Sequence, residues 1–104
     1  MKKISNLHSK PVFCIEHFHS KENCSTQLGS ILQNLASISI QEDGCLQYQL
    51  LIDDSDENHF ILIVAFETAE LMEQHEQQPH VVQFAENEMI ALCDKFYWTE
   101  AKGI

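Results

Sequence analysis

The chain of 104 residues contains no arginine, and its six positive charges, all lysine, oppose sixteen aspartates and glutamates. The net charge of −10 argues against a nucleic-acid partner, because DNA and RNA are bound through basic surfaces. It argues equally against an anionic membrane surface. The missing guanidinium groups also disfavour phosphorylated substrates, which arginine holds through paired hydrogen bonds.

Long apolar runs are missing as well. No run approaches the ~20 residues that a membrane-spanning helix needs. The N-terminal MKKISNLHSK has two lysines but no apolar stretch after them, which is not typical of a secretory signal. We therefore expect a cytoplasmic protein with a flexible tail over residues 1–9 and one domain over residues 10–104.

Two kinds of cofactor motif are absent. The four cysteines, at positions 14, 24, 45 and 93, include no CxxC pair, so a zinc knuckle or a dithiol redox site is not indicated. We expect them to be small buried hydrophobic residues. The chain also lacks a glycine-rich dinucleotide fingerprint, so a flavin or nicotinamide fold is not indicated.

Hydrophobic periodicity predicts the element order β-α-β-β-α-α-β. Apolar runs predict strands over residues 12–18, 45–52, 59–66 and 94–100. Helical spacing predicts helices over residues 22–38, 69–77 and 80–93. Ser20 and Thr68 are the expected N-caps, and Pro79 separates the last two helices. This order predicts a ferredoxin-like α+β fold, an antiparallel sheet with all helices on one face.

The third predicted strand is apolar at every position, so both of its faces should leave water. We assign Ile61, Ile63 and Ala65 to the face under the helices. The alternate positions then form an apolar patch on the open face: Phe60, Leu62, Val64 and Phe66. Such a patch usually marks a partner surface or a ligand pocket. Because a second copy is the simplest cover, we expect a homodimer.

Two segments resemble the antibiotic biosynthesis monooxygenase (ABM) domains, which include small quinol monooxygenases. EDGCLQYQLL is similar to their E-x-G-C-x-x-Y stretch, and FILIVAFETAELMEQHEQQPHVVQF resembles the segment that follows it. The ending YWTEAKGI is also similar, so the resemblance covers about residues 11–104. It implies a dimeric α/β barrel that oxygenates a small aromatic substrate, a quinol or a polycyclic phenol or anthrone, with dioxygen and no cofactor.

Such chemistry requires a general base, an apolar pocket and polar groups that hold the substrate oxygens. His75 is the predicted base, because it follows Leu71 and Met72 on the apolar stripe of its helix. The predicted substrate-binding residues are Tyr48, Leu62, Val64, Phe66 and His80. Structural alternatives stay open: Tyr48 could bury its ring in the core, and His80 could cap backbone N–H groups.

A metal site is not predicted at His75 and His80. Helical ligand pairs stand four residues apart, and a five-residue step with Pro79 before the second histidine breaks that register. Haem is also discounted, because Phe66 and Ala85 stand where haem-degrading relatives carry a tryptophan and a ligand histidine.

One departure from the resemblance concerns the third strand. The family commonly has an E-x-W pattern there, and this chain has Val64 and Phe66. A carboxylate that orients a histidine or a substrate at that position would be missing. Two other functions therefore stay open on the same scaffold: a binding or stress-response dimer without catalysis, and an isomerase of a small carbonyl compound.

Overall fold

The computed structural model describes residues 10–104, so the predicted tail lies outside the described residues. Four strands form one antiparallel sheet in the order β2-β3-β1-β4. The strands are β1 (Val12–Ser20), β2 (Cys45–Asp53), β3 (Asp56–Phe66) and β4 (Cys93–Lys102). The helices are α2 (Ser25–Ser39), α3 (Ala69–Glu76), α4 (Pro79–Gln83), the π-helical turn η1 (Phe84–Glu88) and α5 (Met89–Leu92). This is the predicted ferredoxin-like α+β fold.

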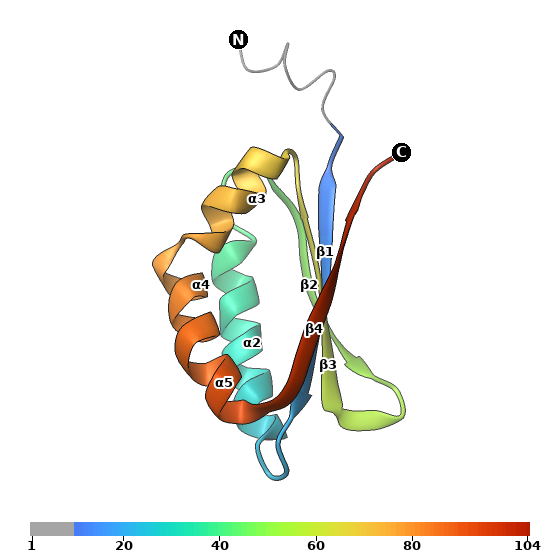
Figure 1. The fold of residues 1–104 in the computed structure, drawn as a ribbon, viewed down its shortest axis with the longest axis vertical. Coiled ribbons are helices and arrows are strands. Elements are labelled where there is room, and N and C mark those ends of the chain that lie inside the picture. Colours follow the sequence, from blue (N-terminus) through green and yellow to red (C-terminus); the bar gives the residue numbers. More distant parts are fainter. Residues whose placement is uncertain (1–9) are drawn as a thin grey trace.

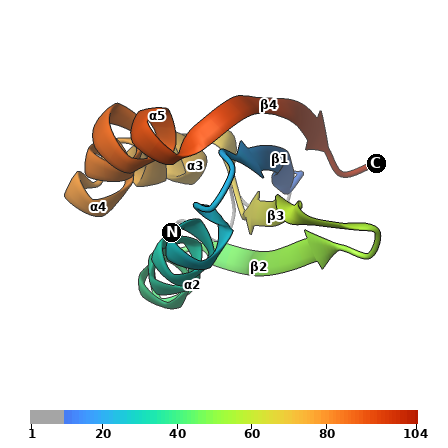
Figure 2. The same ribbon diagram turned by 90° about the horizontal axis from the view of Figure 1, so that it is seen from below.

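All helices lie against one face of the sheet, and the opposite face is open (Figure 1 and Figure 2). Helix α2 runs beside the continuous segment formed by α4, η1 and α5. Helix α3 precedes that segment and lies near the turn that leads from α2 into β2. No helix in residues 10–104 is long and apolar enough to cross a membrane.

The sequence-based assignment of the two faces of β3 is wrong. The side chains that we expected on the open face are buried under the helices: Phe60, Leu62, Val64 and Phe66. Ile61 and Ile63 lie on the open face and are half-buried. The alternation of side chains assigns residues to the two faces of a strand, but it does not tell which face the helices cover when both faces are apolar. The aromatic rings fill the space under the helices, where Phe60 lies close to Gly29 of α2.

The ends of the helices agree only in part with the prediction. Thr68 caps α3 as predicted, because its Oγ1 accepts a hydrogen bond from the Leu71 N–H at 3.2 Å. Ser20 is not a cap, since it ends β1 and its hydroxyl donates to Asn58 Oδ1 at 3.2 Å. Pro79 opens α4 as predicted, after an extended residue that changes the direction of the chain.

The segment between α4 and α5 contains one wide helical turn, η1. The N–H of Met89 bonds to the carbonyl of Phe84, five residues earlier. Phe84 packs edge-on against Phe18 of β1, with ring centroids 5.6 Å apart, and Met89 packs against the same core. Glu88 instead lines a cavity beside α2.

Candidate functional site

The turn between α2 and β2 carries Glu42. Two backbone hydrogen bonds fix the turn, from Glu42 N–H to the Ser39 carbonyl at 3.0 Å and from Cys45 N–H to the Glu42 carbonyl at 3.1 Å. Gly44 has a φ of 77°, and a Cβ there would collide with Leu71 of α3. Only glycine meets both conditions without strain, so the turn is held closely against α3.

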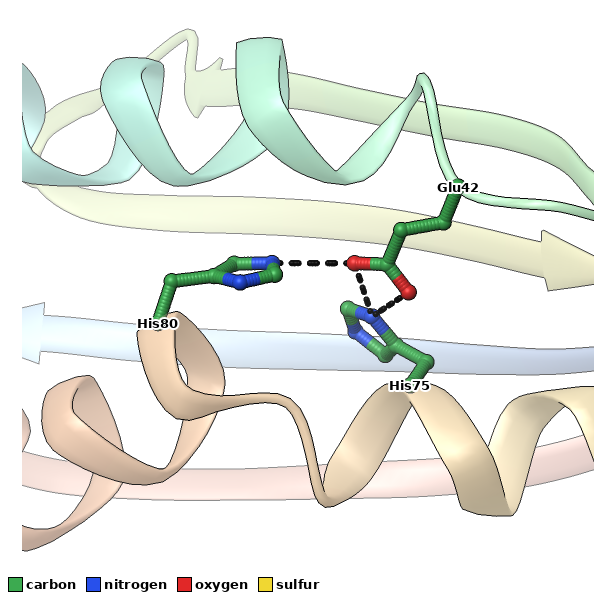
Figure 3. Close-up of side chains that lie close together, drawn as sticks. All are labelled: Glu42, His75 and His80. Atoms are coloured by element: carbon green, nitrogen blue, oxygen red, sulfur yellow. Dashed lines mark hydrogen bonds and ion pairs between the residues drawn. The ribbon is translucent and has the colours of Figure 1, made fainter.

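Glu42, His75 and His80 converge from three different elements (Figure 3). The carboxylate of Glu42 lies 2.9 and 3.0 Å from Nδ1 of His75 and 2.9 Å from Nε2 of His80. The five-residue step between His75 and His80 therefore does not separate them, contrary to the prediction. The chain turns at Gln78 and Pro79, and this turn brings both imidazoles to one carboxylate.

The carboxylate fixes the tautomers of both histidines. An ionised carboxylate can only accept hydrogen bonds, so each neutral imidazole must present an N–H to Glu42. His75 then carries its hydrogen on Nδ1 and exposes a basic Nε2, whereas His80 carries its hydrogen on Nε2 and exposes a basic Nδ1. Glu42 thus orients two neutral bases at once.

Tyr48 and Ser39 extend this group into a hydrogen-bonded chain. The Tyr48 hydroxyl lies 3.2 Å from the basic Nε2 of His75 and donates to it. Ser39 Oγ lies 3.1 Å from Nε2 of His80. Burial raises the pKa of Tyr48, with smaller contributions from the charges of Glu16 and Glu42, although a hydrogen bond from Ser39 opposes them. Tyr48 is therefore a proton donor rather than a base at ordinary pH.

The two histidines differ in their access to solvent. His75 is 4 % exposed, and its ring packs against Phe66 at a centroid distance of 5.0 Å. His80 is 22 % exposed and lines a cavity of about 330 Å³ between α2 and α4. The cavity has an apolar wall and a polar rim, formed by Ser30, Ile31, Asn34, Leu35, Ile38, His80, Gln83, Phe84 and Glu88. Such a mixed lining is typical of small-molecule sites.

The structure brings some of the predicted site residues together and separates others. His75, Tyr48, Phe66 and His80 lie in one cluster. Leu62 and Val64 are fully buried in the core and do not line the cavity next to His80.

Sequence reasoning missed Glu42 and Ser39 as site residues. Glu42 is the first residue of the E-x-G-C-x-x-Y stretch, in the turn between α2 and β2. One signal in the sequence could have indicated that Glu42 pairs with histidine. The chain has no arginine that could pair with this glutamate, but it has histidines. The structure shows that Glu42 supplies a carboxylate to His75, although position 64 is a valine.

A second cavity, of about 470 Å³, lies between α3, β1 and β4 and is rich in carboxylates. Its lining includes Cys14, Glu76 and Glu100. Glu16 lies two residues from Cys14 on the same face of β1, and burial raises its pKa to about 7. The charge of Glu76 adds to this shift, whereas a hydrogen bond from Cys14 opposes it. Burial and Glu16 together raise the pKa of the Cys14 thiol to about 12, so this thiol is not a nucleophile at neutral pH.

A further group of histidines lies on the open face of the sheet. His17 Nδ1 lies 2.9 Å from His59 Nε2, and His19 stacks on His59 with ring centroids 4.1 Å apart. Tyr97 of β4 stacks on His17 at 4.6 Å. His17 and His19 share one face of β1. Burial and the neighbouring His59 lower the pKa of both side chains.

Solved structures from several bacteria share this fold. A Shewanella oneidensis protein is 19 % identical, with 92 % of this chain and 93 % of that chain covered and a TM-score of 0.88. A Pseudomonas aeruginosa protein is 25 % identical, with coverages of 92 % and 96 % and a TM-score of 0.86. A Deinococcus radiodurans protein, described as a candidate antibiotic biosynthesis monooxygenase, is 23 % identical, with coverages of 89 % and 92 % and a TM-score of 0.80.

No curated protein has a significant sequence match to the chain. The family model of the antibiotic biosynthesis monooxygenases matches residues 11–87. This match includes Glu42, Tyr48, His75 and His80 of the hydrogen-bonded cluster. The chain therefore belongs to the antibiotic biosynthesis monooxygenase family.

Proposed function

We propose that the protein is a cofactor-independent monooxygenase that oxidises a quinol or a polycyclic phenol or anthrone with dioxygen. The observation that carries the proposal is the carboxylate of Glu42 between His75 and His80, each at 2.9 Å. Family membership supports the reaction class. The size and lining of the cavity next to His80 support a small aromatic substrate.

The base in this proposal is a histidine that Glu42 orients through a hydrogen bond. His80 is the histidine that reaches the cavity, so its exposure favours His80 over the predicted His75 for direct proton uptake. His75 is the positioning residue, because it holds the other side of the carboxylate and is fixed by Tyr48. An oriented imidazole with a carboxylate partner is a common general base near neutral pH.

The cavity suits a flat, mostly apolar molecule that carries a hydroxyl group. Ile31, Leu35, Ile38 and Phe84 provide its apolar wall, which would cover the rings of a substrate. With few charged groups in the lining, the pocket would place the phenolic hydroxyl near His80 and exclude water from the reacting carbon.

The reaction balances without an added reductant. Removal of the hydroxyl proton gives an electron-rich anion that can transfer an electron to dioxygen, and the two radicals then combine at carbon. The resulting peroxide keeps one oxygen atom in the product and releases the other as water. The substrate supplies all of the electrons, and the protein supplies the base and the enclosed pocket.

We expect His75→Gln and His80→Gln to lower the rate of oxygen uptake by different routes. His80→Gln should lower kcat by about 10²-fold or more, because it removes the base. It should also raise KM, because His80 lines the cavity. His75→Gln should lower kcat with little change in KM, because His75 does not line the cavity. The measurement is oxygen uptake by chelator-treated protein with menadiol and with an anthrone.

Oxygen uptake by the wild-type protein tests the proposed reaction class. Uptake no faster than the non-enzymatic background, across a panel of hydroquinones and anthrones, would contradict the monooxygenase proposal. Product formation without oxygen consumption would instead support an isomerase. Substrate binding without turnover would support a binding dimer without catalysis. The carboxylate of Glu42 argues against this alternative, because it reaches His75 although position 64 is a valine.

We also propose that two copies pair through the open faces of their sheets. Phe13, Ile15, Ile61 and Ile63 share this face with Leu51. The strand positions beside them carry Gln47, Gln49, Thr99 and Ala101, and Asp53 lies toward the end of this face, 3.7 Å from His59. For a chain with a net charge of −10, a central surface without carboxylates is the favourable place for self-association.

The pairing predicts that Ile63→Glu shifts the protein from dimer to monomer, because it buries two carboxylates in the proposed interface. The matched control is Ile90→Glu, since Ile90 is an exposed isoleucine on α5 and should leave the mass unchanged. Light scattering after gel filtration at micromolar concentration measures both. A wild-type mass of one chain would refute the dimer.

A further inference from the structure

The group of Glu42, His75 and His80 presents three potential metal ligands in a small volume. One carboxylate oxygen and one ring nitrogen from each histidine all lie within 4.8 Å of one another. Two imidazoles with one carboxylate are a donor set for Zn²⁺ and for other divalent ions of the first transition row. We propose that this group is a binding site for one such ion per chain.

The ligand spacing is close to what an ion requires. The nitrogen-to-oxygen distances of 2.9 Å are those of N–H···O hydrogen bonds. Tetrahedral zinc with bonds of about 2.0 to 2.1 Å separates its ligand atoms by about 3.3 Å. The nitrogen-to-oxygen distances would therefore lengthen by a few tenths of an ångström, and the two ring nitrogens, which lie within 4.8 Å of each other, would have to reach about the same separation through side-chain rotation.

The hydrogen-bonded chain can adapt to the ion without a net loss of protons. When the metal replaces the hydrogen on Nδ1 of His75, that hydrogen moves to Nε2 and donates to the Tyr48 oxygen, 3.2 Å away. His80 makes the corresponding change, from Nε2 to Nδ1. Metal-binding histidines commonly donate their second N–H in this way, which fixes the ring. Tyr48 thus already stands where an outer partner of the site is needed.

An ion also has a path to the group. His75 is nearly enclosed, but Glu42 and His80 are 17 % and 22 % exposed, and His80 lines the cavity beside α2. An ion that enters there meets His80 first, because neither Glu42 nor His75 lines this cavity. The remaining coordination positions would face the cavity and take water or another oxygen donor.

The proposal is independent of the oxygenation reaction, but it has one consequence for it. The ion would occupy the same carboxylate and nitrogens that orient the proposed base. If the oxygenation proposal is right, Zn²⁺ would inhibit it. Titration with the ion measures binding itself, so that a failure of either proposal can be recognised separately.

The test is titration of chelator-treated full-length protein with Zn²⁺ by calorimetry and with Co²⁺ by visible absorption. We expect one ion per chain and Co²⁺ bands of a nitrogen and oxygen site, without thiolate-to-metal charge transfer. Glu42→Gln and His80→Gln should each weaken binding at least about tenfold. Circular dichroism of both variants checks that they remain folded.

The matched control is the double variant His17→Gln/His19→Gln. It removes two imidazoles of the open-face histidine group and should leave the affinity unchanged. Binding that is lost in this control but kept in Glu42→Gln would overturn the proposal. Thiolate charge-transfer bands, or no binding of either ion at tens of micromolar protein, would overturn it as well.

Discussion

Replacing Glu42 with glutamine is expected to lower kcat for oxygen uptake by about 10²- to 10⁴-fold, the range associated with loss of general-base catalysis. Both histidines present an N–H to the carboxylate at 2.9 Å. A glutamine has one acceptor oxygen and one donor NH₂ group in place of two acceptor oxygens. One histidine would then have to change its tautomer or lose its hydrogen bond.

The change in charge acts in the same direction. A histidine that takes up a proton becomes an imidazolium, and Glu42 is its nearest counter-charge. In a half-buried position this pairing is worth more than at the surface. The glutamine variant loses it, so we expect the loss of rate to appear mainly in kcat.

Asp43→Asn is the matched control for Glu42→Gln. It removes the same charge from the adjacent position of the turn, where the side chain is exposed, and should leave the rate within a factor of about two, since isolated surface charges contribute little. Equal losses in both variants would contradict a specific role for Glu42. Full activity of Glu42→Gln would remove the carboxylate from the proposed mechanism.

The second large effect concerns stability and pH at Glu16. Its pKa is raised from 4.5 to about 7 in the folded protein, chiefly by burial. The folded state therefore binds more protons than the unfolded state between these values, and the free energy of unfolding falls as the pH rises through this window. The full shift corresponds to at most about 3 kcal/mol, at about 1.4 kcal/mol per pKa unit.

Glu16→Gln should remove this dependence, because glutamine stays neutral at every pH. We expect the variant to be more stable than the wild type at pH 8 by up to about 3 kcal/mol and nearly equal to it at about pH 4.5. Urea denaturation across this pH range measures the difference. Glu73→Gln, an exposed carboxylate in the cavity that Cys14 and Glu76 line, is the control. A parallel pH dependence of wild type and Glu16→Gln would contradict the prediction.

The sequence predicts the element order because strong local signals mark it. The Thr68 hydroxyl can accept a backbone hydrogen bond and cap α3, and the ring of Pro79 favours the first position of α4. The apolar runs have the right lengths for strands. The faces of β3 are different. Both are apolar, and only the packing of its aromatic rings against α2 decides which one is covered.

The site is harder to predict than the fold because its residues come from separate elements. Glu42 lies in a turn, where no periodicity tells which way a side chain points. His75 and His80 belong to two helices, and their meeting depends on the direction that the chain takes at Pro79. His75 was found from its place on an apolar helical stripe, whereas its carboxylate partner follows only from the packing of the turn on α3.

The wide helical turn η1 has a consequence for the order of residues along its helix. In a regular α-helix the residue four positions after Phe84, which is Glu88, would follow it on the same face. That register would direct a carboxylate into the apolar core. With one additional residue in the turn, Met89 takes the core position instead, and Glu88 lies at the cavity wall with His80. A single-residue offset thus keeps the core apolar and the cavity rim polar within one continuous helix.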